Sequence, residues 1–322
     1  MDDILNKYRL ALLGTGDIAN FHYDAFIKAG FSIDYCAAKK NSKRAKVFAN
    51  NNKIKNYYSD PFELIENHQK WDMILLAIDT DYNHLYLEKI MKLDKPCLVE
   101  KPVFTDLSLF KYIDLLKHPK IRVAYNRRYY ETIQRAKLFI KNNAPVTCRV
   151  ELPESIDFHS DNKFEPVLLN SVHGIDLLLY LFGDLKIINN TKVFSPDGRV
   201  SILKNDDGDV INLIMNWNSP SNFSFNFEAK GERLEIKPFE ISRLYKGMDI
   251  IEPTKDIRIR RFFPKDIEEV SSFPSLKNEL KPGFYEQALD MKNILDGKKS
   301  KISASLFDAY KAQKLVQEIL FI

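Results

Sequence analysis

The sequence has few of the residues that stabilise small secreted proteins or bind structural metals. Only three cysteines occur among the 322 residues, and there is no Cys-x-x-Cys pair or Cys/His cluster. An odd number of widely spaced cysteines argues against a disulfide framework and against a zinc-finger type of site. We therefore expect Cys36, Cys97 and Cys148 to be reduced, mostly buried thiols, and we expect no bound metal.

The sequence also lacks long apolar segments and a large excess of one charge. Its first residues, Met-Asp-Asp-Ile-Leu-Asn-Lys, contain no apolar signal core, and no apolar run approaches the length of a membrane span. The 48 basic and 44 acidic residues give a net charge of +4, which is too small and too mixed for a dedicated nucleic-acid-binding protein. We expect a cytoplasmic protein without nucleic-acid or membrane partners.

The sequence does contain enough apolar residues for two domains. Hydrophobic residues make up 45% of a chain that is longer than the size at which one core usually stops growing, about 250–300 residues. Residues 1–123 alternate strand-like and helix-like segments, which predicts a doubly wound parallel sheet. Residues 124–322 are rich in strand-like segments from 185 to about 261, flanked by helical ones. We predict an α/β protein: an N-terminal Rossmann domain and a C-terminal α+β domain on an open, mainly antiparallel sheet.

A glycine-rich turn follows the first strand-like run. Residues 14–19 read Gly-Thr-Gly-Asp-Ile-Ala, a GxGxxA sequence that opens a helical segment. In such a turn the first glycine permits the tight bend, the second lets the backbone approach a pyrophosphate, and the small third residue lets helix and strand pack closely. Amide groups at the helix N-terminus favour the phosphates. We predict dinucleotide binding by Gly14, Thr15, Gly16, Asp17 and Ile18.

The residues after the second strand bear on which dinucleotide binds. Sites that prefer NAD usually place an acid there, to bond the ribose 2′-hydroxyl. Here Lys39, Lys40 and Arg44 follow the strand instead, and the acidic Asp34 lies earlier, within it. Basic residues at this place favour a 2′-phosphate, although a solvated basic loop would read the same way. We expect NADP or NAD, with NADP preferred.

A Glu-Lys-Pro tripeptide at 100–102 follows the apolar run Cys97-Leu98-Val99. The carboxyl ends of parallel strands are where doubly wound folds bind ligands. An ammonium at this edge can donate to a carbonyl or alkoxide oxygen as a hydride moves. A lysine on a surface loop is the alternative interpretation of Lys101.

Together these motifs resemble the Gfo/Idh/MocA oxidoreductase family. The resemblance rests on GTGDIA, on the segment 77–84, on VEKP at 99–102, on YNRRY at 125–129 and on HGIDLLLYLFG at 173–183. The family implies NAD(P)-dependent oxidation or reduction of sugars, nucleotide sugars or polyols. It also implies a C-terminal sheet that faces the cofactor cleft and commonly forms a homo-oligomer interface.

The resemblance implies roles for individual residues. Lys101 matches the catalytic lysine, and His173 matches the histidine that moves the substrate proton, with Asp176 on the same side of its helix. A neutral imidazole serves as a base near pH 7. Asn170 is the nearest polar residue that can orient His173. Further cofactor contacts are expected from Asp79, His84, Glu100 and Lys101, and substrate contacts from Lys101, Asn126, Arg128, Asn170 and His173.

The sequence departs from the family pattern at one important place. Many members carry an aspartate four residues before the histidine, where this chain has Leu169. That departure bears on proton transfer more than on cofactor binding. It leaves a regulator that binds the dinucleotide without turnover as an alternative to the dehydrogenase. A glycosidase that oxidises its substrate transiently with bound NAD, a variation that the family resemblance implies, is a third alternative.

Overall fold

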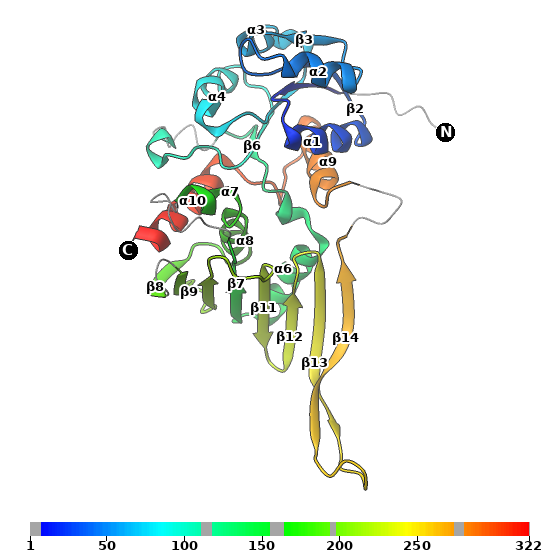
Figure 1. Cartoon of the computed structure of the whole chain (residues 1–322), viewed down its shortest axis with the longest axis vertical. Coiled ribbons are helices and arrows are strands. Elements are labelled where there is room, and N and C mark those ends of the chain that lie inside the picture. Colours follow the sequence, from blue (N-terminus) through cyan, green and yellow to red (C-terminus); the bar gives the residue numbers. More distant parts are fainter. Residues whose placement is uncertain (1–7, 111–117, 155–163, 194–197, 274–279, 322) are drawn as a thin grey trace, which may run out of the picture. The chain divides into compact units, whose positions relative to one another are not determined.

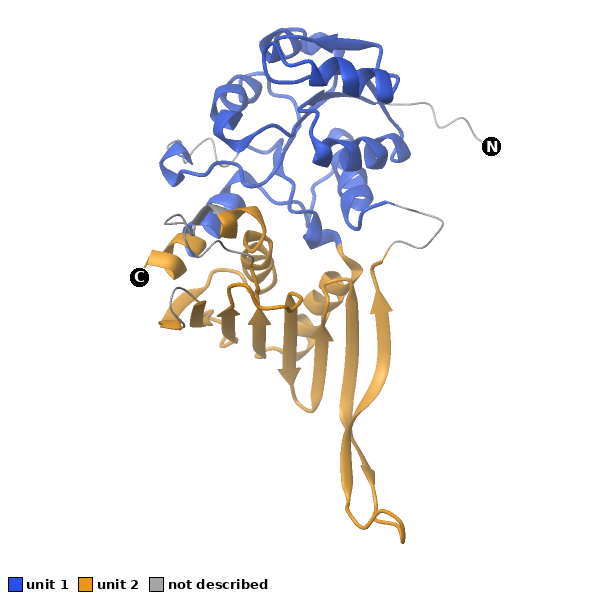
Figure 2. Cartoon of the chain, in the orientation of Figure 1, with its two compact units in different colours: residues 1–129, 274–315 blue, residues 130–273, 316–322 orange. Residues whose placement is uncertain are grey.

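A computed structural model divides the chain into two compact units (Figure 2). Unit 1 comprises Met1–Tyr129 and Pro274–Leu315, and unit 2 comprises Tyr130–Phe273 and Val316–Ile322. The structure describes residues 8–110, 118–154, 164–193, 198–273 and 280–321. A late segment of the chain thus packs with its N-terminal part. The domain boundary between residues 123 and 124 stays a prediction.

Unit 1 is built on a six-stranded parallel sheet, as the alternation of segments predicts. The strand order is β3-β2-β1-β4-β5-β6, so the order reverses direction between β1 and β4. Loops at the carboxyl ends of strands beside such a reversal form the ligand crevice of doubly wound folds. The strands are β1 (Tyr8–Leu13), β2 (Phe31–Ala37), β3 (Asn56–Tyr58), β4 (Met73–Leu76), β5 (Cys97–Val99) and β6 (Ile121–Val123).

Helices connect the strands of unit 1. The helix after the glycine turn buries a face with helical spacing, which includes Ala19, His22 and Phe26. Phe26 meets Phe31 of β2 edge-on, with 5.0 Å between ring centroids. Among the residues described, the helices of the unit are α1 (Asp17–Lys28), α2 (Arg44–Asn51), α3 (Pro61–Glu66), α4 (Asn83–Met91), α9 (Phe284–Leu295) and the first part of α10 (Leu306–Phe321), with 3₁₀ turns at His68–Lys70, Thr80–Tyr82, Leu107–Phe110 and Asn126–Tyr129.

The late segment belongs to unit 1 because α9 packs on α1. Phe284 at the start of α9 lies against Phe21 and His22 of α1, with ring centroids 6.0 and 4.6 Å apart. Phe284, Ala288 and Met291 are buried in the same core cluster as β1 and β2. Helix α9 therefore completes the hydrophobic cover of one face of the parallel sheet.

Unit 2 is built on an eight-stranded sheet in the order β14-β13-β12-β11-β7-β10-β9-β8 (Figure 1). Every neighbouring pair is antiparallel except β7 and β10, which confirms the predicted fold class. The strands are β7 (Thr147–Glu151), β8 (Lys186–Val193), β9 (Gly198–Lys204), β10 (Val210–Met215), β11 (Ser224–Ala229), β12 (Glu232–Ile236), β13 (Ile241–Ile251) and β14 (Arg261–Ser271).

Helices cover one face of this sheet. They are α6 (Glu131–Asn143) and α8 (Val172–Phe182), and the short helix α7 (Phe164–Leu169) packs on α8. Phe139 of α6 and Phe182 of α8 both lie against Phe227 of β11, with ring centroids 6.4 and 6.1 Å apart. Alternate residues of the central strands are buried on this side. Among the described residues, no helix is long and apolar enough to cross a membrane.

Candidate functional site

The glycine turn connects β1 to α1, and the fold itself requires its first glycine. Gly14 has a φ of +118°, which residues with a side chain rarely adopt. A Cβ atom at this position would lie 2.0 Å from the Ala77 carbonyl oxygen, beyond the end of β4. The Gly14 N–H donates to the Ala37 carbonyl at the end of β2, over 2.8 Å. Gly14 thus lets the chain turn from β1 into α1 in close contact with the ends of the two neighbouring strands, β2 and β4.

The second glycine has no such structural reason. Gly16 is the N-cap of α1 with a φ of −81°, and a Cβ built there meets no atom within 4 Å. The Thr15 hydroxyl oxygen beside it is buried and has no hydrogen-bond partner among the described residues. Open backbone, an unpaired hydroxyl and the N-terminus of a 12-residue helix fit a diphosphate group. The turn therefore suits the pyrophosphate of a dinucleotide.

The turn opens into a pocket of about 360 Å³ within unit 1. The pocket collects the ends of β1, β2 and β4, as expected at the reversal of strand order. Seven of the predicted cofactor residues line it: Gly14, Thr15, Gly16, Lys39, Lys40, Arg44 and Asp79. The remaining lining residues are Ala38, Asn41, Ser42, Pro61, Ala77, Ile78, Tyr82 and Tyr86.

The three basic residues of the pocket differ in their partners. The Lys39 ammonium donates to the Tyr82 hydroxyl over 2.6 Å, which raises the lysine pKa. The Lys40 ammonium pairs with Asp60 at 2.9 Å, and this pairing raises the Lys40 pKa and lowers that of Asp60. The Arg44 guanidinium is exposed and has no side-chain partner in the part of the chain that the structure describes.

Two of these partners were missed by sequence reasoning. Asp60 has a local signal, because it precedes Pro61 and caps α3 by accepting the Phe62 N–H over 2.9 Å. Tyr82 has none, since it follows Lys39 by 43 residues and reaches the pocket only through the fold. Lys39 and Arg44 remain the basic groups best placed to meet a phosphate in this pocket.

Other predicted cofactor residues lie near the pocket but do not line it. Asp17 and Ile18 form the first turn of α1, behind the glycines. His84 is exposed on α4, while the neighbouring Asn83 is buried and donates to the Val103 carbonyl over 2.8 Å. Asp79 does line the pocket, and its carboxylate accepts the Asp81 N–H over 3.2 Å. The structure thus groups most, but not all, of the predicted residues.

The Glu-Lys-Pro tripeptide follows β5, where Glu100 is held from two sides. Its Oε1 lies 2.6 Å from Nε2 of His22, which is completely buried on α1. Its Oε2 accepts the backbone N–H of Lys101 over 3.0 Å. A carboxylate accepts these bonds, so Nε2 of His22 is the donor. The predicted cofactor residue Glu100 therefore fixes the backbone that carries Lys101.

The late segment of unit 1 also reaches this region. Asn126 donates from Nδ2 to the Pro282 carbonyl over 3.1 Å. The Lys281 ammonium lies 4.7 Å from the ring centre of Phe21 and 5.4 Å from that of Phe284. Burial lowers the pKa of Lys281, and the nearby Glu100 carboxylate opposes that shift. Lys281 thus lies near Glu100, and Phe284 lies against its partner His22, although no motif in the sequence predicted either group.

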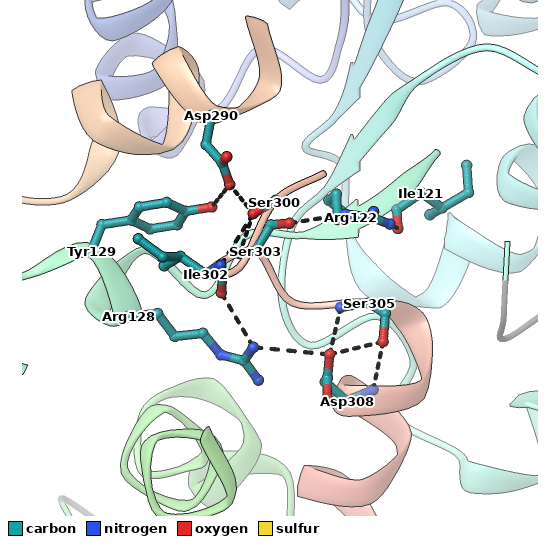
Figure 3. A network of polar contacts seen from close by, with 10 residues as sticks. All are labelled: Ile121, Arg122, Arg128, Tyr129, Asp290, Ser300, Ile302, Ser303, Ser305 and Asp308. Carbon is teal, nitrogen blue, oxygen red and sulfur yellow. Dashed lines mark hydrogen bonds and ion pairs between the residues drawn. The ribbon is translucent and has the colours of Figure 1, made fainter. Parts of the chain in front are cut away.

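Arg128 lies in a network of polar contacts inside unit 1 (Figure 3). Its side chain is buried, and its Nη1 lies 3.4 Å from the Ile302 carbonyl and 3.9 Å from Asp308. Asp308 in turn accepts from the N–H and the hydroxyl of Ser305, each over 2.8 Å. Arg128 therefore holds the chain that leads into α10, and its predicted contact with substrate stays a prediction.

The same network fixes the residue after Arg128. The Tyr129 hydroxyl donates to Asp290 of α9 over 2.7 Å, and the Ser300 hydroxyl donates to the same oxygen over 2.5 Å. Burial raises the pKa of Tyr129 well above its ordinary value. Through these bonds the last turn of the Rossmann part is tied to α9 and to residues 300–308 within one unit.

The predicted proton-transfer residues lie in unit 2, at the start of α8. The His173 side chain is buried in the first turn of the helix. The backbone N–H of His173 donates to the Asn170 carbonyl over 3.0 Å. Leu169 stands where many members of the family carry an aspartate, and it is 53% exposed. The position therefore supplies neither an acid nor a buried side chain to His173.

A carboxylate reaches the same helix start from another strand. Glu154 follows β7, and its Oε2 accepts the Ser171 N–H over 3.0 Å and the Ser171 hydroxyl over 2.6 Å. Its Oε1 lies 3.4 Å from Nδ2 of Asn170. Sequence reasoning missed Glu154, because it precedes Asn170 by 16 residues and belongs to no motif. The Glu154 side chain fixes the turn from which Asn170 and His173 project.

Comparison with known proteins tests the sequence resemblance. Residues 8–125 match the GFO_IDH_MocA model, described as an oxidoreductase family with an NAD-binding Rossmann fold. The matched residues span β1 to the end of β6 and contain the glycine turn, the pocket and Lys101. The comparison with curated protein sequences finds no match.

Solved structures are similar over nearly the whole chain. A putative NADPH-dependent oxidoreductase from Desulfitobacterium hafniense has a TM-score of 0.77 at 16% identity, covering 98% of this chain and 94% of that one. Levoglucosan dehydrogenase with NADH and levoglucosan has 0.74 at 15%, covering 97% and 95%. myo-Inositol dehydrogenase from Lactobacillus casei, with NAD(H) and myo-inositol, has 0.70 at 16%, covering 96% and 92%.

These similarities differ in what they establish. At such low identity the solved structures show a shared fold. The family match is the stronger finding, because it covers the segment that holds the glycine turn and the Glu-Lys-Pro tripeptide. It confirms the resemblance seen in the sequence. Residues 8–125 of this chain match the model of the Gfo/Idh/MocA oxidoreductase family, with its NAD-binding Rossmann fold.

Proposed function

We propose that the protein is an NAD(P)-dependent dehydrogenase or reductase that acts on a CH–OH group of a sugar, a nucleotide sugar or a related polyol. The observation that carries the proposal is the glycine turn, where Gly16 is left open although the fold does not require a glycine there. Lys101 follows β5 at the carboxyl edge of the same sheet, where doubly wound folds bind their ligands. By resemblance, Lys101 matches the family's catalytic lysine.

The dinucleotide, when bound, supplies the hydride acceptor or donor. Lys101 then donates a hydrogen bond to the substrate oxygen and stabilises negative charge that develops on it. His173 takes the hydroxyl proton as a hydride leaves the carbinol carbon, and returns the proton in the reverse direction. Glu100 holds the backbone of Lys101, and Glu154 holds the turn before His173. The roles of Lys101 and His173 rest on the resemblance of the motifs.

We propose NADP as the preferred dinucleotide. A 2′-phosphate attracts cations that are always charged, and Lys39 and Arg44 both line the pocket. The Lys39 ammonium is protonated at neutral pH, as an ordinary lysine is, and its hydrogen bond to the Tyr82 hydroxyl raises its pKa further. Lys40 is the weaker candidate among the three predicted basic residues, since Asp60 already neutralises it. Among the similar solved structures, one is described as NADPH-dependent and others contain NAD(H).

Cytoplasmic location and assembly into a homo-oligomer through the C-terminal sheet, which the resemblance implies, stay predictions. So do the direct contacts of Asn126, Arg128 and Asn170 with substrate. Asn126 and Arg128 are buried and bonded to the late segment of unit 1. Both can shape the site through residues 282 and 302 without touching the substrate themselves.

The experiment is a screen for turnover. The purified chain is mixed with NADP or NAD and a panel of polyols and sugars, and the absorbance of the reduced nicotinamide is followed. The proposal predicts accumulation of reduced dinucleotide in solution with at least one polyol, and its loss in Lys101→Ala. Binding without any turnover would favour the regulator, and sugar hydrolysis without release of reduced dinucleotide would favour the glycosidase.

A further inference from the structure

One hydrogen bond in the pocket of unit 1 joins the ends of two strands that are not neighbours. Lys39 follows β2 and Tyr82 follows β4, while β1 lies between these strands in the sheet. Strands that are two places apart lie about 10 Å from each other. The bond from the Lys39 ammonium to the Tyr82 hydroxyl, over 2.6 Å, therefore carries the lysine side chain across the end of the strand that leads into the glycine turn.

Tyr82 is the fixed member of this pair. Its backbone N–H donates to the Asp79 carbonyl over 3.0 Å, and the Asp79 carboxylate caps the same 3₁₀ turn by accepting the Asp81 N–H. The next residue, Asn83, is buried and donates to the Val103 carbonyl over 2.8 Å. The Tyr82 side chain is half-buried and has only two torsions before its ring. Its hydroxyl is thus presented at a defined place in the pocket.

Lys39 is the mobile member of the pair. Its side chain is exposed, and a lysine loses the freedom of four rotatable bonds when its ammonium is held in one place. If a ligand has to impose that order, the loss subtracts from the free energy of binding. The Tyr82 ring adds a second contact, with its centre 4.3 Å from the Lys39 ammonium. One anchored side chain therefore directs the ammonium into the pocket.

The neighbouring lysine shows why an uncharged partner matters. Lys40 pairs with the Asp60 carboxylate at 2.9 Å, and the negative charge of that partner offsets its own. Tyr82 contributes a neutral hydroxyl, and its bond to Lys39 uses one of the three hydrogens of the ammonium. Lys39 is therefore held in place without being neutralised, as a lysine that meets an anion requires.

The same part of the pocket does not favour an unmodified ribose. Strand β2 ends at Ala37, and Ala38 rather than an acid precedes Lys39, so this strand end offers no carboxylate to the 2′-hydroxyl of NAD. A 2′-phosphate accepts a charge-assisted hydrogen bond from an ammonium, which is about twice as strong as a bond between neutral groups. An ammonium held in this place therefore favours NADP over NAD.

We propose that Tyr82 is a positioning residue that selects a dinucleotide with a 2′-phosphate, because it holds the Lys39 ammonium over the end of β1. The proposal rests on the proposed function, in which this pocket binds NADP. Tyr82 acts through Lys39 and does not replace it. Loss of the Tyr82 hydroxyl therefore weakens NADPH, leaves NADH almost unchanged, and has no effect where Lys39 is absent.

The test compares two tyrosines that line the same pocket. Tyr82→Phe keeps the ring and removes the hydroxyl. Tyr86→Phe is the matched control, because the Tyr86 ring packs on Phe62, with centroids 5.0 Å apart, one helical turn further along the chain. Isothermal titration of the full chain measures NADPH, NADH and adenosine 2′,5′-bisphosphate, which carries the phosphate without the nicotinamide.

We expect Tyr82→Phe to raise the Kd of NADPH and of the bisphosphate by about 3- to 10-fold, which is the effect of ordering one long side chain. The Kd of NADH should change by less than about 2-fold, and Tyr86→Phe should change none of the three by more than that. The ratio of NADPH to NADH affinity is the decisive quantity, because a general disturbance of the pocket would weaken both nucleotides.

A double-mutant cycle with Lys39→Ala shows whether Tyr82 acts through the lysine. Lys39→Ala alone should weaken NADPH by about 10-fold or more, because it removes the charge itself. Tyr82→Phe should then add no further loss in the Lys39→Ala chain. Thermal melts check that each variant is folded.

The proposal is overturned if Tyr82→Phe leaves NADPH affinity unchanged or strengthens it, if it weakens NADH equally, or if its effect persists in Lys39→Ala. With any of these results, a wild type that binds NADPH more tightly than NADH still supports the proposed function. A folded wild type that binds neither nucleotide would overturn the proposed function, and the role of Tyr82 with it.

Discussion

Nε2 of His22 lies 2.6 Å from Oε1 of Glu100, although 78 residues separate them. His22 is completely buried on α1, and Glu100 immediately precedes Lys101. The glycine-turn helix is therefore bonded directly to the loop that carries the proposed catalytic lysine. The helix that follows the glycine turn and the Glu-Lys-Pro tripeptide meet through Glu100, which belongs to the tripeptide, and His22, which no motif predicted.

Removal of this histidine should destabilise unit 1. In His22→Ala the Glu100 carboxylate keeps the Lys101 N–H but loses its buried donor, which costs about 2 kcal/mol in the free energy of unfolding. Urea denaturation measures the change. His84→Ala is the matched control, because that histidine is exposed on α4 and its removal should change stability by less than about 0.5 kcal/mol. Equal effects of the two substitutions would contradict a structural role for the pair.

The two glycines of the turn should respond differently to alanine. Gly14→Ala places a methyl group against the Ala77 carbonyl in a backbone conformation that alanine avoids, so we expect a loss of more than about 3 kcal/mol of stability. Gly16→Ala has free space and an ordinary φ, so its stability should stay within about 1 kcal/mol of wild type. Its methyl group would occupy the place of the pyrophosphate, and NADPH affinity should fall by at least about 10-fold. A folded Gly16→Ala with unchanged affinity would remove the main support for the site.

The basic residues of the pocket should not contribute equally to the choice of dinucleotide. Arg44→Ala removes a guanidinium with no side-chain partner among the described residues, and it should weaken NADPH by about 10- to 100-fold. NADH, which has no 2′-phosphate, should bind almost as before. Lys40→Ala removes an ammonium that Asp60 already holds, so its effect on NADPH should be below about 3-fold. Isothermal titration with both nucleotides gives two affinities for each variant. The assignment fails if Arg44→Ala weakens both nucleotides alike.

One ion pair should make the stability of unit 1 depend on pH. The Arg9 guanidinium holds both carboxylate oxygens of Asp72, from Nη2 at 2.8 Å and from Nε at 3.1 Å, and lowers the pKa of Asp72 below its ordinary value of 3.8. The folded chain therefore binds this proton more weakly than the unfolded chain. The stabilisation is complete above the unfolded pKa and is lost as pH falls through the folded one.

Asp72→Asn should accordingly be less stable than wild type at neutral pH, and the difference should shrink below about pH 4. Thermal melts from neutral pH to about pH 3 measure it. Asp94→Asn is a suitable control, since Asp94 pairs with Lys120 in a solvent-exposed ion pair that contributes little. A difference between Asp72→Asn and wild type that does not change with pH would contradict the role of the ion pair.

The parts of the fold that the sequence predicted correctly are those whose signals lie within a short stretch of the chain. The strands at 8–13 and 73–76 each end in four consecutive buried apolar residues, and the GxGxxA turn opens α1 as expected. Such features depend on residues a few positions apart, where periodicity and turn chemistry are visible. The pocket also follows from them, because strand ends at a reversal of strand order must lie together.

Contacts between distant segments could not be predicted in this way. Helix α9 carries an ordinary amphipathic pattern, which does not say that it packs on α1. Glu154 bonds Ser171 across 17 residues, and Lys39 meets Tyr82 across 43. Each of these pairs joins residues whose own segments would fold equally well without the partner, so only the tertiary structure shows them.

The most direct test of the central claim is a fluorescence titration of the wild-type chain with NADPH and, separately, with NADH. The open glycine turn and the basic pocket predict saturable binding, with NADPH tighter than NADH and with much weaker binding in Gly16→Ala. Absence of binding by either nucleotide at millimolar concentration, in a chain shown to be folded, would contradict the assignment of this pocket to a nicotinamide dinucleotide.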